Sequence, residues 1–291
     1  MKGIILAGGS GSRLWPSTSI ISKQLLPIYD KPMIYYPLST LMLAGVKEIL
    51  IITSPRDHDS FVNLLGSGSS LGITLHFAIQ EKPRGIAEAF IIGNNFLNNE
   101  SCLLILGDNV FYGAGFGMQL QNSLPDNGAH IFTYEVSDPS SYGVLNLDSK
   151  KNPLSVIEKP IESKSKLAIT GLYYFDYKAV QFANAISPSA RGELEITAVI
   201  DRYLEAGELS FTHLSRGIAW LDTGSPQSLH EAASFIRVVE ERTGLKIACL
   251  EEIAYRMGYI SIEELIARVE GLPISEYKSY LLRFINDINN E

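Results

Sequence analysis

The sequence has few cysteines and no long hydrophobic segment. Its 291 residues include only two cysteines, Cys102 and Cys249. They cannot form a disulfide framework, so we expect buried or surface thiols in a reducing compartment. The longest apolar segment, residues 33–44, is interrupted by Tyr, Pro, Ser and Thr. The N-terminal apolar run spans about five residues and ends in glycines, too short for a signal peptide. We therefore predict no membrane partner and a cytoplasmic protein.

Positive charge is also scarce. The chain has 24 Lys and Arg against 32 Asp and Glu, a net charge of −8. Proteins that bind nucleic acids through phosphate contacts carry an excess of basic residues, so no nucleic-acid partner is expected. An anionic substrate would require a local group of cations or a metal ion. A hydrophobic content of 46% with 19% charged residues excludes disordered and fibrous classes.

Short β-rich segments alternate with amphipathic segments of helical length over the first two thirds of the chain. This order is typical of βαβ units around a mostly parallel sheet, and predicts an α/β fold. The predicted strands of this part are residues 3–7, 48–53, 74–79, 102–106 and 130–136, and the predicted helices are residues 32–44, 57–65 and 86–96.

The pattern changes after about residue 140, where longer polar loops separate the apolar segments. Strands are predicted at residues 144–147, 155–158, 168–175, 208–213 and 217–221, and helices dominate from residue 225 onward. We expect one domain of residues 1–225 with two lobes, about 1–140 and 141–225, that share a sheet. Residues 226–291 would be a helical region for packing, oligomer contacts and regulation.

A glycine-rich loop, GGSGSR at residues 8–13, follows the first predicted strand. Small residues there let backbone N–H groups approach phosphates, although a glycine turn without a ligand is also common. The loop is not a P-loop, because Gly11 is followed by Ser12 and Arg13 instead of Lys and Ser or Thr. It is not the dinucleotide motif either, because position 14 is Leu. Arg13 and Lys23 supply two cations suited to a polyphosphate.

Three motifs carry a resemblance to a known family. The segments LAGGSGSRL at residues 6–14 and KQLLP at residues 23–27 resemble the sugar nucleotidyltransferases, and YDKPMIYYPL at residues 29–38 is similar to the branch that joins thymidine nucleotides to glucose 1-phosphate. Further matches extend to about residue 257. The resemblance implies a Rossmann-like, three-layer nucleotidyltransferase fold with a mixed, mostly parallel central sheet, a smaller sugar-binding lobe and C-terminal helices.

The same resemblance implies a reaction. It predicts Mg²⁺-dependent transfer of a thymidylyl group from dTTP to glucose 1-phosphate by direct in-line displacement, giving dTDP-glucose and pyrophosphate. This would be the first step of dTDP-rhamnose-type deoxysugar synthesis, carried out by a homo-oligomer, a tetramer. Two alternatives stay open. Uracil presents the same amide edge as thymine, so the enzyme could be a uridylyltransferase or another sugar-1-phosphate nucleotidyltransferase. The chain could also bind sugar nucleotides without turnover.

Two aspartates follow apolar strands. Asp108 comes after residues 102–106, and Asp222 ends the segment AWLD. Either residue alone could be a turn or helix-cap residue. The carboxyl ends of strands are ligand sites in open α/β sheets, and Mg²⁺ prefers one or two carboxylates with phosphate oxygens and water. The resemblance implies that both aspartates hold Mg²⁺ and that the catalytic residues are Arg13, Lys23, Lys159 and Asp108.

Gln80 closes the third predicted strand. Its amide offers a donor and an acceptor, which match the edge of thymine or uracil, although a lone glutamine is usually a surface residue. The resemblance assigns base recognition to Gln80 and Gly85. The nucleotide-binding residues it implies are Gly8, Gly9, Gly11, Ser12, Arg13, Gln24, Gln80, Pro83, Gly85 and Asp108. Arg84, Ile86 and Glu88 depart from the Asp, Leu and Gln that are usual in the family.

The second lobe contains the candidates for binding the sugar phosphate. Glu158 and Lys159 would be an ordinary solvated pair without the resemblance. With it, Gly143, Glu158 and the backbone of Ile169 contact the hexose, while Lys159 and Arg191 bind its phosphate; Asn109 and Tyr173 belong to the same set. A possible regulatory site, implied between subunits, comprises Tyr112, Gly113, Arg216, Glu252, Ile253 and Arg256.

Overall fold

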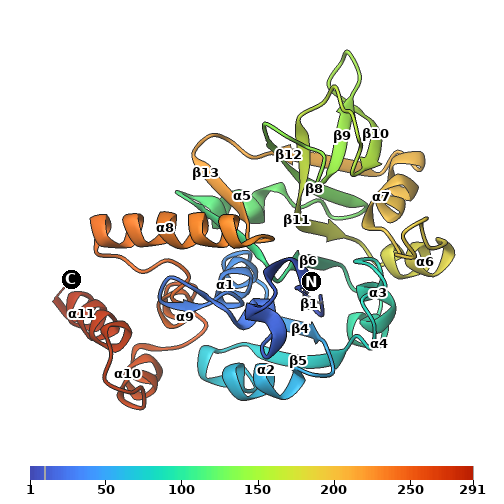
Figure 1. Ribbon diagram of the computed structural model, residues 1–291. Coiled ribbons are helices and arrows are strands. Elements are labelled where there is room, and N and C mark those ends of the chain that lie inside the picture. The colour runs from blue at the N-terminus through green and yellow to red at the C-terminus, as the bar shows by residue number, and fades with distance from the viewer. Residues whose placement is uncertain (10, 291) are drawn as a thin grey trace.

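The computed structural model describes residues 1–9 and 11–290 and contains a central sheet flanked by helices (Figure 1). Ser10, a member of the glycine-rich loop, lies outside the described residues. The centre of the sheet is formed by parallel strands in the order β6 (Cys102–Leu106), β1 (Lys2–Ala7), β4 (Glu48–Thr53) and β5 (Thr74–Ile79). These strands lie where the sequence predicts them, because each is a short, largely apolar segment between polar or turn-forming residues.

The strands of the second half extend the same sheet. β11 (Leu167–Phe175) pairs antiparallel with β6 and also with β8 (Ala129–Glu135) and β9 (Gly143–Leu147). The outer strands are β10 (Pro153–Glu158), which pairs with β9, and β12 (Leu209–His213), which pairs with β8. The predicted α/β fold with a mixed central sheet shared by both parts is therefore confirmed.

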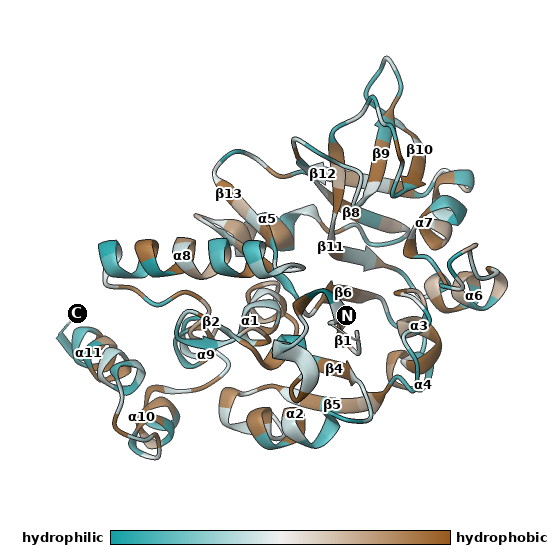
Figure 2. Cartoon of the chain, in the orientation of Figure 1, coloured by the Kyte–Doolittle hydropathy of each residue, from teal (hydrophilic) through white to brown (hydrophobic). Residues whose placement is uncertain are grey.

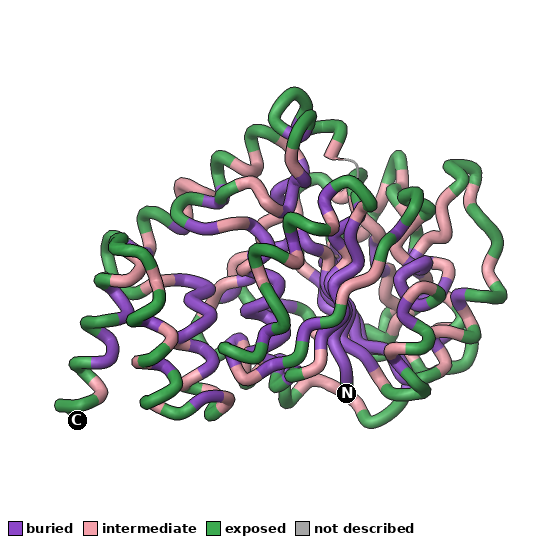
Figure 3. Tube along the Cα trace, turned by 90° about the horizontal axis from the view of Figure 1, so that it is seen from below, coloured by how far each residue is buried: buried purple, intermediate pink, exposed green. Residues whose placement is uncertain are grey.

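Helices cover both faces of this sheet. One face packs against α1 (Tyr35–Leu43) and α2 (His58–Leu65), with α9 (Leu250–Arg256) packed on α1, and the other against α3 (Glu88–Ile92), α4 (Asn94–Leu97), α6 (Lys178–Ala185) and α7 (Ile196–Glu205). Alternate strand residues point to opposite faces, so Ile5 and Ile51 join the first core while Ile4 and Leu50 join the second. The central strands, such as β1 and β4, are among the most hydrophobic and most buried parts of the chain (Figures 2 and 3).

The last part of the chain is helical, as predicted. It consists of α8 (Pro226–Thr243), α9, α10 (Ile262–Glu270) and α11 (Glu276–Asn290). α8 begins at Pro226 because Ser225 and Ser228 form a capping box there. Buried Lys31 forms an ion pair with Glu240 of α8 at 2.9 Å, which fastens the helix to the ribbon of β2 (Pro27–Ile28) and β3 (Lys31–Pro32).

Some elements differ from the prediction. The helix predicted at residues 32–44 begins at Tyr35, because residues 31–32 pair with residues 27–28. The helix predicted at residues 86–96 divides into α3 and α4 around Gly93. Strands and helices that were not predicted include β2, β3, β7 (Asn109–Gly113), α5 (Phe116–Ser123), α6 and α7. β2, β3 and β7 are short, and α5 contains a glycine, which weakens their signals, whereas α7 has a clear amphipathic pattern that the prediction overlooked.

Both cysteines are buried, and burial raises the pKa of the Cys102 and Cys249 thiols to about 12. Among the described residues, none of the helices is both long enough and apolar enough to span a membrane.

His130 is a buried titratable group in β8. Its ring nitrogens lie 2.8 Å from Ser210 Oγ and 2.9 Å from Thr212 Oγ1. Burial lowers the pKa of His130 to about 4 from its ordinary value of 6.5. Between these values the unfolded chain binds more protons at this site than the folded chain does. The free energy of unfolding therefore falls as the pH drops through this window.

We predict that this group alone lowers the free energy of unfolding by roughly 2–3 kcal/mol between pH 6.5 and pH 4. In His130→Asn, the free energy of unfolding should depend less on pH between pH 4 and pH 6.5, as measured by urea unfolding at a series of pH values. His230→Asn, at an exposed position of α8, is the matched control and should retain the wild-type slope. If the free energy of unfolding depended on pH equally in wild type and His130→Asn, His130 would not be the group responsible.

Candidate active site

Two aspartates meet because two distant segments pair. β7 begins directly after Asp108 and pairs antiparallel with β13 (Ile218–Asp222), so that Asp222 lies opposite Asn109. Thr223 Oγ1 donates to the Asp108 carbonyl at 2.8 Å and secures the end of the ribbon. Burial and the nearby Asp108 carboxylate raise the pKa of Asp222. The two carboxylates thus form a compact negative site at the carboxyl end of β6.

The side chain of Asp108 is held on both oxygens. Buried Lys23 forms an ion pair with Oδ2, and Asn109 Nδ2 donates to Oδ1 at 2.9 Å. Asn109 is itself fixed, because its Oδ1 accepts from the Gly171 N–H at 3.1 Å and from Trp220 Nε1 at 2.6 Å. Asn109 therefore orients Asp108. The predicted contact of Asn109 with the sugar phosphate stays a prediction.

One cavity of about 150 Å³ joins this negative site to the second lobe. Its wall contains residues from both halves of the chain. The predicted site residues among them are Arg13, Asp108, Asn109, Gly143, Glu158, Lys159, Ile169, Tyr173 and Asp222. Arg13 lies against Gly224, where a Cβ would be 2.9 Å from the guanidinium Nη2. The structure thus brings most of the predicted catalytic and sugar-binding residues into a single space.

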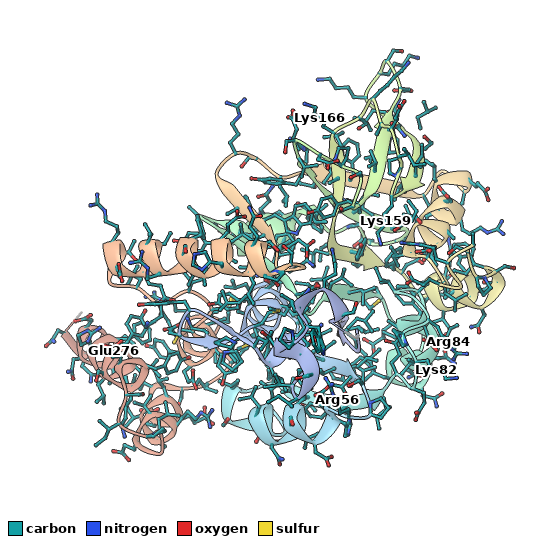
Figure 4. All side chains as sticks on the ribbon, in the orientation of Figure 1. Arg56, Lys82, Arg84, Lys159, Lys166 and Glu276 are labelled. Atoms are coloured by element: carbon teal, nitrogen blue, oxygen red, sulfur yellow. The ribbon has the colours of Figure 1, made fainter. Side chains whose placement is uncertain are left out.

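Arg191 is placed differently from the other candidates for binding the sugar phosphate. It is outside the residues that line the cavity, and its Nη2 contacts Glu158 Oε1 at 3.1 Å and Glu195 Oε1 at 2.9 Å. Lys159 does line the cavity, with its Nζ 3.7 Å from Glu158 Oε1. Figure 4 shows Lys159 on the side of the second lobe. In this arrangement Lys159 is the more accessible cation for a phosphate.

Gln80 lies at the end of β5 and faces the glycine-rich loop. A Cβ on Gly8 would be 2.6 Å from Gln80 Oε1, so Gly8 leaves the space that this oxygen uses. Gly85 has a φ of +107°, and a Cβ there would lie 2.3 Å from the Leu194 carbonyl oxygen. Two backbone hydrogen bonds join the loop after β5 to the segment before α7. The Leu194 N–H donates to the Arg84 carbonyl, and the Ala87 N–H donates to the Leu194 carbonyl.

The remaining nucleotide candidates lie around this loop. Gly9, Ser12 and Pro83 are exposed, and Gly11, in the left-handed conformation with a φ of 61°, precedes a single 3₁₀ turn. Gln24 is buried, and its Oε1 accepts from Ser22 Oγ at 2.7 Å. Its amide is therefore already partly engaged within the protein.

The possible regulatory residues separate into two places. A cavity of about 420 Å³ is lined by Tyr112, Gly113, Glu252, Ile253 and Arg256. Arg216 lies elsewhere, in a different cavity with Lys166 and His213. Within the described part of this chain, Arg216 therefore does not share a cavity with the other five residues.

The donor set at the two aspartates suits a hard cation. Groups of three or more His, Cys, Asp or Glu side chains that could hold a metal are absent from residues 1–9 and 11–290. A pair of carboxylates is nevertheless what Mg²⁺ requires when phosphate oxygens and water complete its shell. Burial and the nearby Asp108 carboxylate disfavour ionisation of Asp222, and a divalent cation would relieve that repulsion.

Several residues of the cavity were missed by sequence reasoning. Trp220 donates to Asn109, Thr197 Oγ1 donates to Glu158 Oε2 at 3.2 Å, and Tyr142 lies in the wall. Thr197 follows Arg191 within the segment RGELEIT, and Trp220 precedes Asp222 by two residues. Their closeness in the sequence to predicted site residues could have pointed to Thr197 and Trp220. The sequence does not show, however, which side chains they contact.

The geometry agrees with the outcome of comparison with known proteins. The model of the nucleotidyl transferase family matches residues 2–238, so the chain belongs to that family. A glucose-1-phosphate thymidylyltransferase from Neisseria gonorrhoeae is 54% identical over 98% of this chain and 99% of its own length. One from Mycobacterium tuberculosis is 50% identical over the same shares. Within the nucleotidyl transferases, the chain is grouped with the glucose-1-phosphate thymidylyltransferases.

Solved structures support the same grouping. A Bacillus anthracis protein described as a glucose-1-phosphate thymidylyltransferase, in complex with sucrose, is 38% identical with a TM-score of 0.74, covering 81% of this chain and 95% of that one. A UDP-glucose pyrophosphorylase complexed with UDP-glucose shares the fold, with a TM-score of 0.72 and 22% identity over 82% of this chain and 98% of that one. The predicted family and enzyme class are confirmed.

Proposed function

We propose that the protein transfers the thymidylyl group of dTTP to glucose 1-phosphate, yielding dTDP-glucose and pyrophosphate. The observation that carries this proposal is the single cavity lined by Arg13, Asp108 and Asp222 together with Glu158 and Lys159. It offers groups for a triphosphate and for a sugar phosphate in one space. The names of the full-length relatives identify the nucleotide and the sugar that fit these groups.

The chemistry requires no covalent intermediate. A phosphate oxygen of glucose 1-phosphate forms a bond to the α-phosphorus of dTTP, and the bond from that phosphorus to the bridging oxygen breaks. Pyrophosphate leaves with the electron pair. The protein must bring together two anions that repel each other, and fixed cations provide most of this effect. Lys159 attracts the sugar phosphate, and Arg13 binds the triphosphate.

Enzymes of this kind use a divalent metal, and we propose Mg²⁺ here, held by Asp108 and Asp222. When bound, it neutralises negative charge on the phosphate oxygens. Lys23 and Asn109 keep the Asp108 carboxylate in one orientation, so that its oxygens need not reorganise during the reaction. Lys23 also compensates part of the negative charge of the two aspartates.

The direct test compares nucleotides. Pyrophosphate release is measured with glucose 1-phosphate and Mg²⁺, using dTTP or UTP at matched concentrations below saturation. We expect faster release from dTTP, by about 10- to 100-fold, since one methyl group contributes on the order of 1–3 kcal/mol to discrimination. Equal or faster release from UTP would identify a uridylyltransferase, and no release from either would indicate a binding protein.

Replacing Asp108 tests the metal site. Asp108→Asn removes the charge and one of the two oxygens that accept from Lys23 and Asn109, and turnover with dTTP should fall by about 10²–10³-fold. Turnover is measured with increasing Mg²⁺. Glu276→Gln on α11, well separated from Lys159 in Figure 4, is the control and should leave turnover unchanged. Full activity of Asp108→Asn at saturating Mg²⁺ would exclude Asp108 as a metal ligand.

We propose further that the cavity beside Arg256 binds a regulatory nucleotide sugar in a homotetramer. Tyr112, Glu252 and Arg256 offer an aromatic face, an acceptor and a cation to such a ligand. Because α1 is largely buried within the chain, the helical tail is the stronger candidate for subunit contacts; Ile274 and Leu282 are exposed there.

Two measurements test this proposal: the type of inhibition tests the regulatory site, and the molecular mass tests the tetramer. dTDP-rhamnose should inhibit in a manner not competitive with dTTP, and light scattering should give the mass of four 32.1 kDa chains. Strictly competitive inhibition would remove the second site. A monomeric mass would remove the tetramer.

A further inference from the structure

A chain of three polar side chains lies behind the end of β5. Gln80 Nε2 donates to Glu88 Oε2 at 2.8 Å, and Glu88 Oε1 accepts from Arg84 Nε at 2.8 Å. Gln80 and Glu88 are 3% and 4% exposed, whereas the side chain of Arg84 is 68% exposed. Figure 4 shows Arg84 near Lys82 at the edge of the molecule beside α3. The buried amide is thus linked through a carboxylate to an external cation.

The partners determine which way the Gln80 amide points. An ionised carboxylate can only accept hydrogen bonds, so the amide nitrogen must face Glu88. The amide oxygen then points in the opposite direction, and it is this oxygen that lies 2.6 Å from the position of a Cβ on Gly8. Rotating the amide by half a turn would place its oxygen against the Glu88 carboxylate, which is unfavourable in a buried position.

We propose that Glu88 is a positioning residue that fixes Gln80 as a hydrogen-bond acceptor and so selects bases carrying a donor at the facing edge. The inference rests on the proposed function and on the base recognition by Gln80 that the sequence resemblance predicts. Thymine and uracil present an N3–H donor there, whereas cytosine presents N3 as an acceptor and would meet the amide oxygen unfavourably. Arg84 pairs with Glu88 and maintains the carboxylate as an acceptor.

Glu88→Gln tests this polarity with a nearly isosteric change. Arg84 has only donors, so the new amide at position 88 turns its oxygen toward Arg84 and its nitrogen toward Gln80. Gln80 then turns its own oxygen toward that nitrogen, giving up the 3.4 Å contact of its Nε2 with the Gly85 carbonyl, and its own nitrogen faces the base. We expect the ratio of kcat/KM for dTTP over dCTP to fall by about 10- to 100-fold. The change should appear mainly in KM, because the phosphate groups are untouched.

A second substitution should restore the preference. In the double variant Arg84→Asp, Glu88→Gln, residue 84 becomes an acceptor, so residue 88 turns its nitrogen toward it and its oxygen back toward Gln80. The dTTP preference should return to within a few-fold of wild type. A packing role for Glu88 would not produce this recovery, since the double variant differs more from the wild-type contacts than the single one. Lys82→Ala, which removes a neighbouring exposed cation, should leave the ratio unchanged.

Binding of dTTP and dCTP is measured by calorimetry for wild type and the same variants. These binding ratios test the role of Glu88 separately from the proposed catalytic function. A wild-type protein that binds dTTP in preference to dCTP but releases no pyrophosphate would contradict the proposed function, and the Glu88 variants would still be tested by their binding ratios. An unchanged dTTP to dCTP ratio in Glu88→Gln would overturn the role of Glu88. Failure of the double variant to recover the ratio would overturn it equally.

Discussion

The hydrogen bonds of one buried amide organise this site. Asn109 donates to Asp108 and accepts from the β11 backbone at Gly171 and from Trp220 of β13. Three elements far apart in sequence thereby meet at one side chain. Gly171 makes this possible, because a Cβ there would be 2.7 Å from the Asn109 amide. Unpaired, the polar atoms of this amide would be costly in so buried a position, so the three elements are constrained together.

The site divides its charges between the two lobes. Asp108, Asp222, Lys23 and Arg13 occupy the side formed by the first strands and the β7–β13 ribbon, and Glu158 with Lys159 occupies the side of the outer strands. Each anionic substrate therefore has its own cation near its expected position. A chain with a net negative charge can offer such cations to two anions, because the local arrangement of charges outweighs the overall charge.

The sequence predicts the parallel centre of the fold well, because apolar segments between polar turns leave little choice of structure. It also places Asp108 and Asp222 at strand ends. The sequence pattern alone does not predict that the two aspartates are neighbours, because this depends on the pairing of β7 with β13. These strands are far apart in the chain: Asn109 and Trp220, which form a hydrogen bond, are 111 positions apart. The partners of Arg191 were equally hidden, since its ion pair with Glu158 depends on how the segment before α7 folds back. Glu88 was visible only as an unusual residue, and its meaning depends on the turn that places it against Gln80.

The backbone hydrogen bonds between residues 84–87 and Leu194 join the loop after β5 to the segment that carries Arg191 and Glu195. With Gly85 packed against the Leu194 carbonyl, neither segment has room to shift alone. A displacement of the loop after β5 is therefore coupled through main-chain contacts to the segment before α7, although the two segments are distant in the sequence.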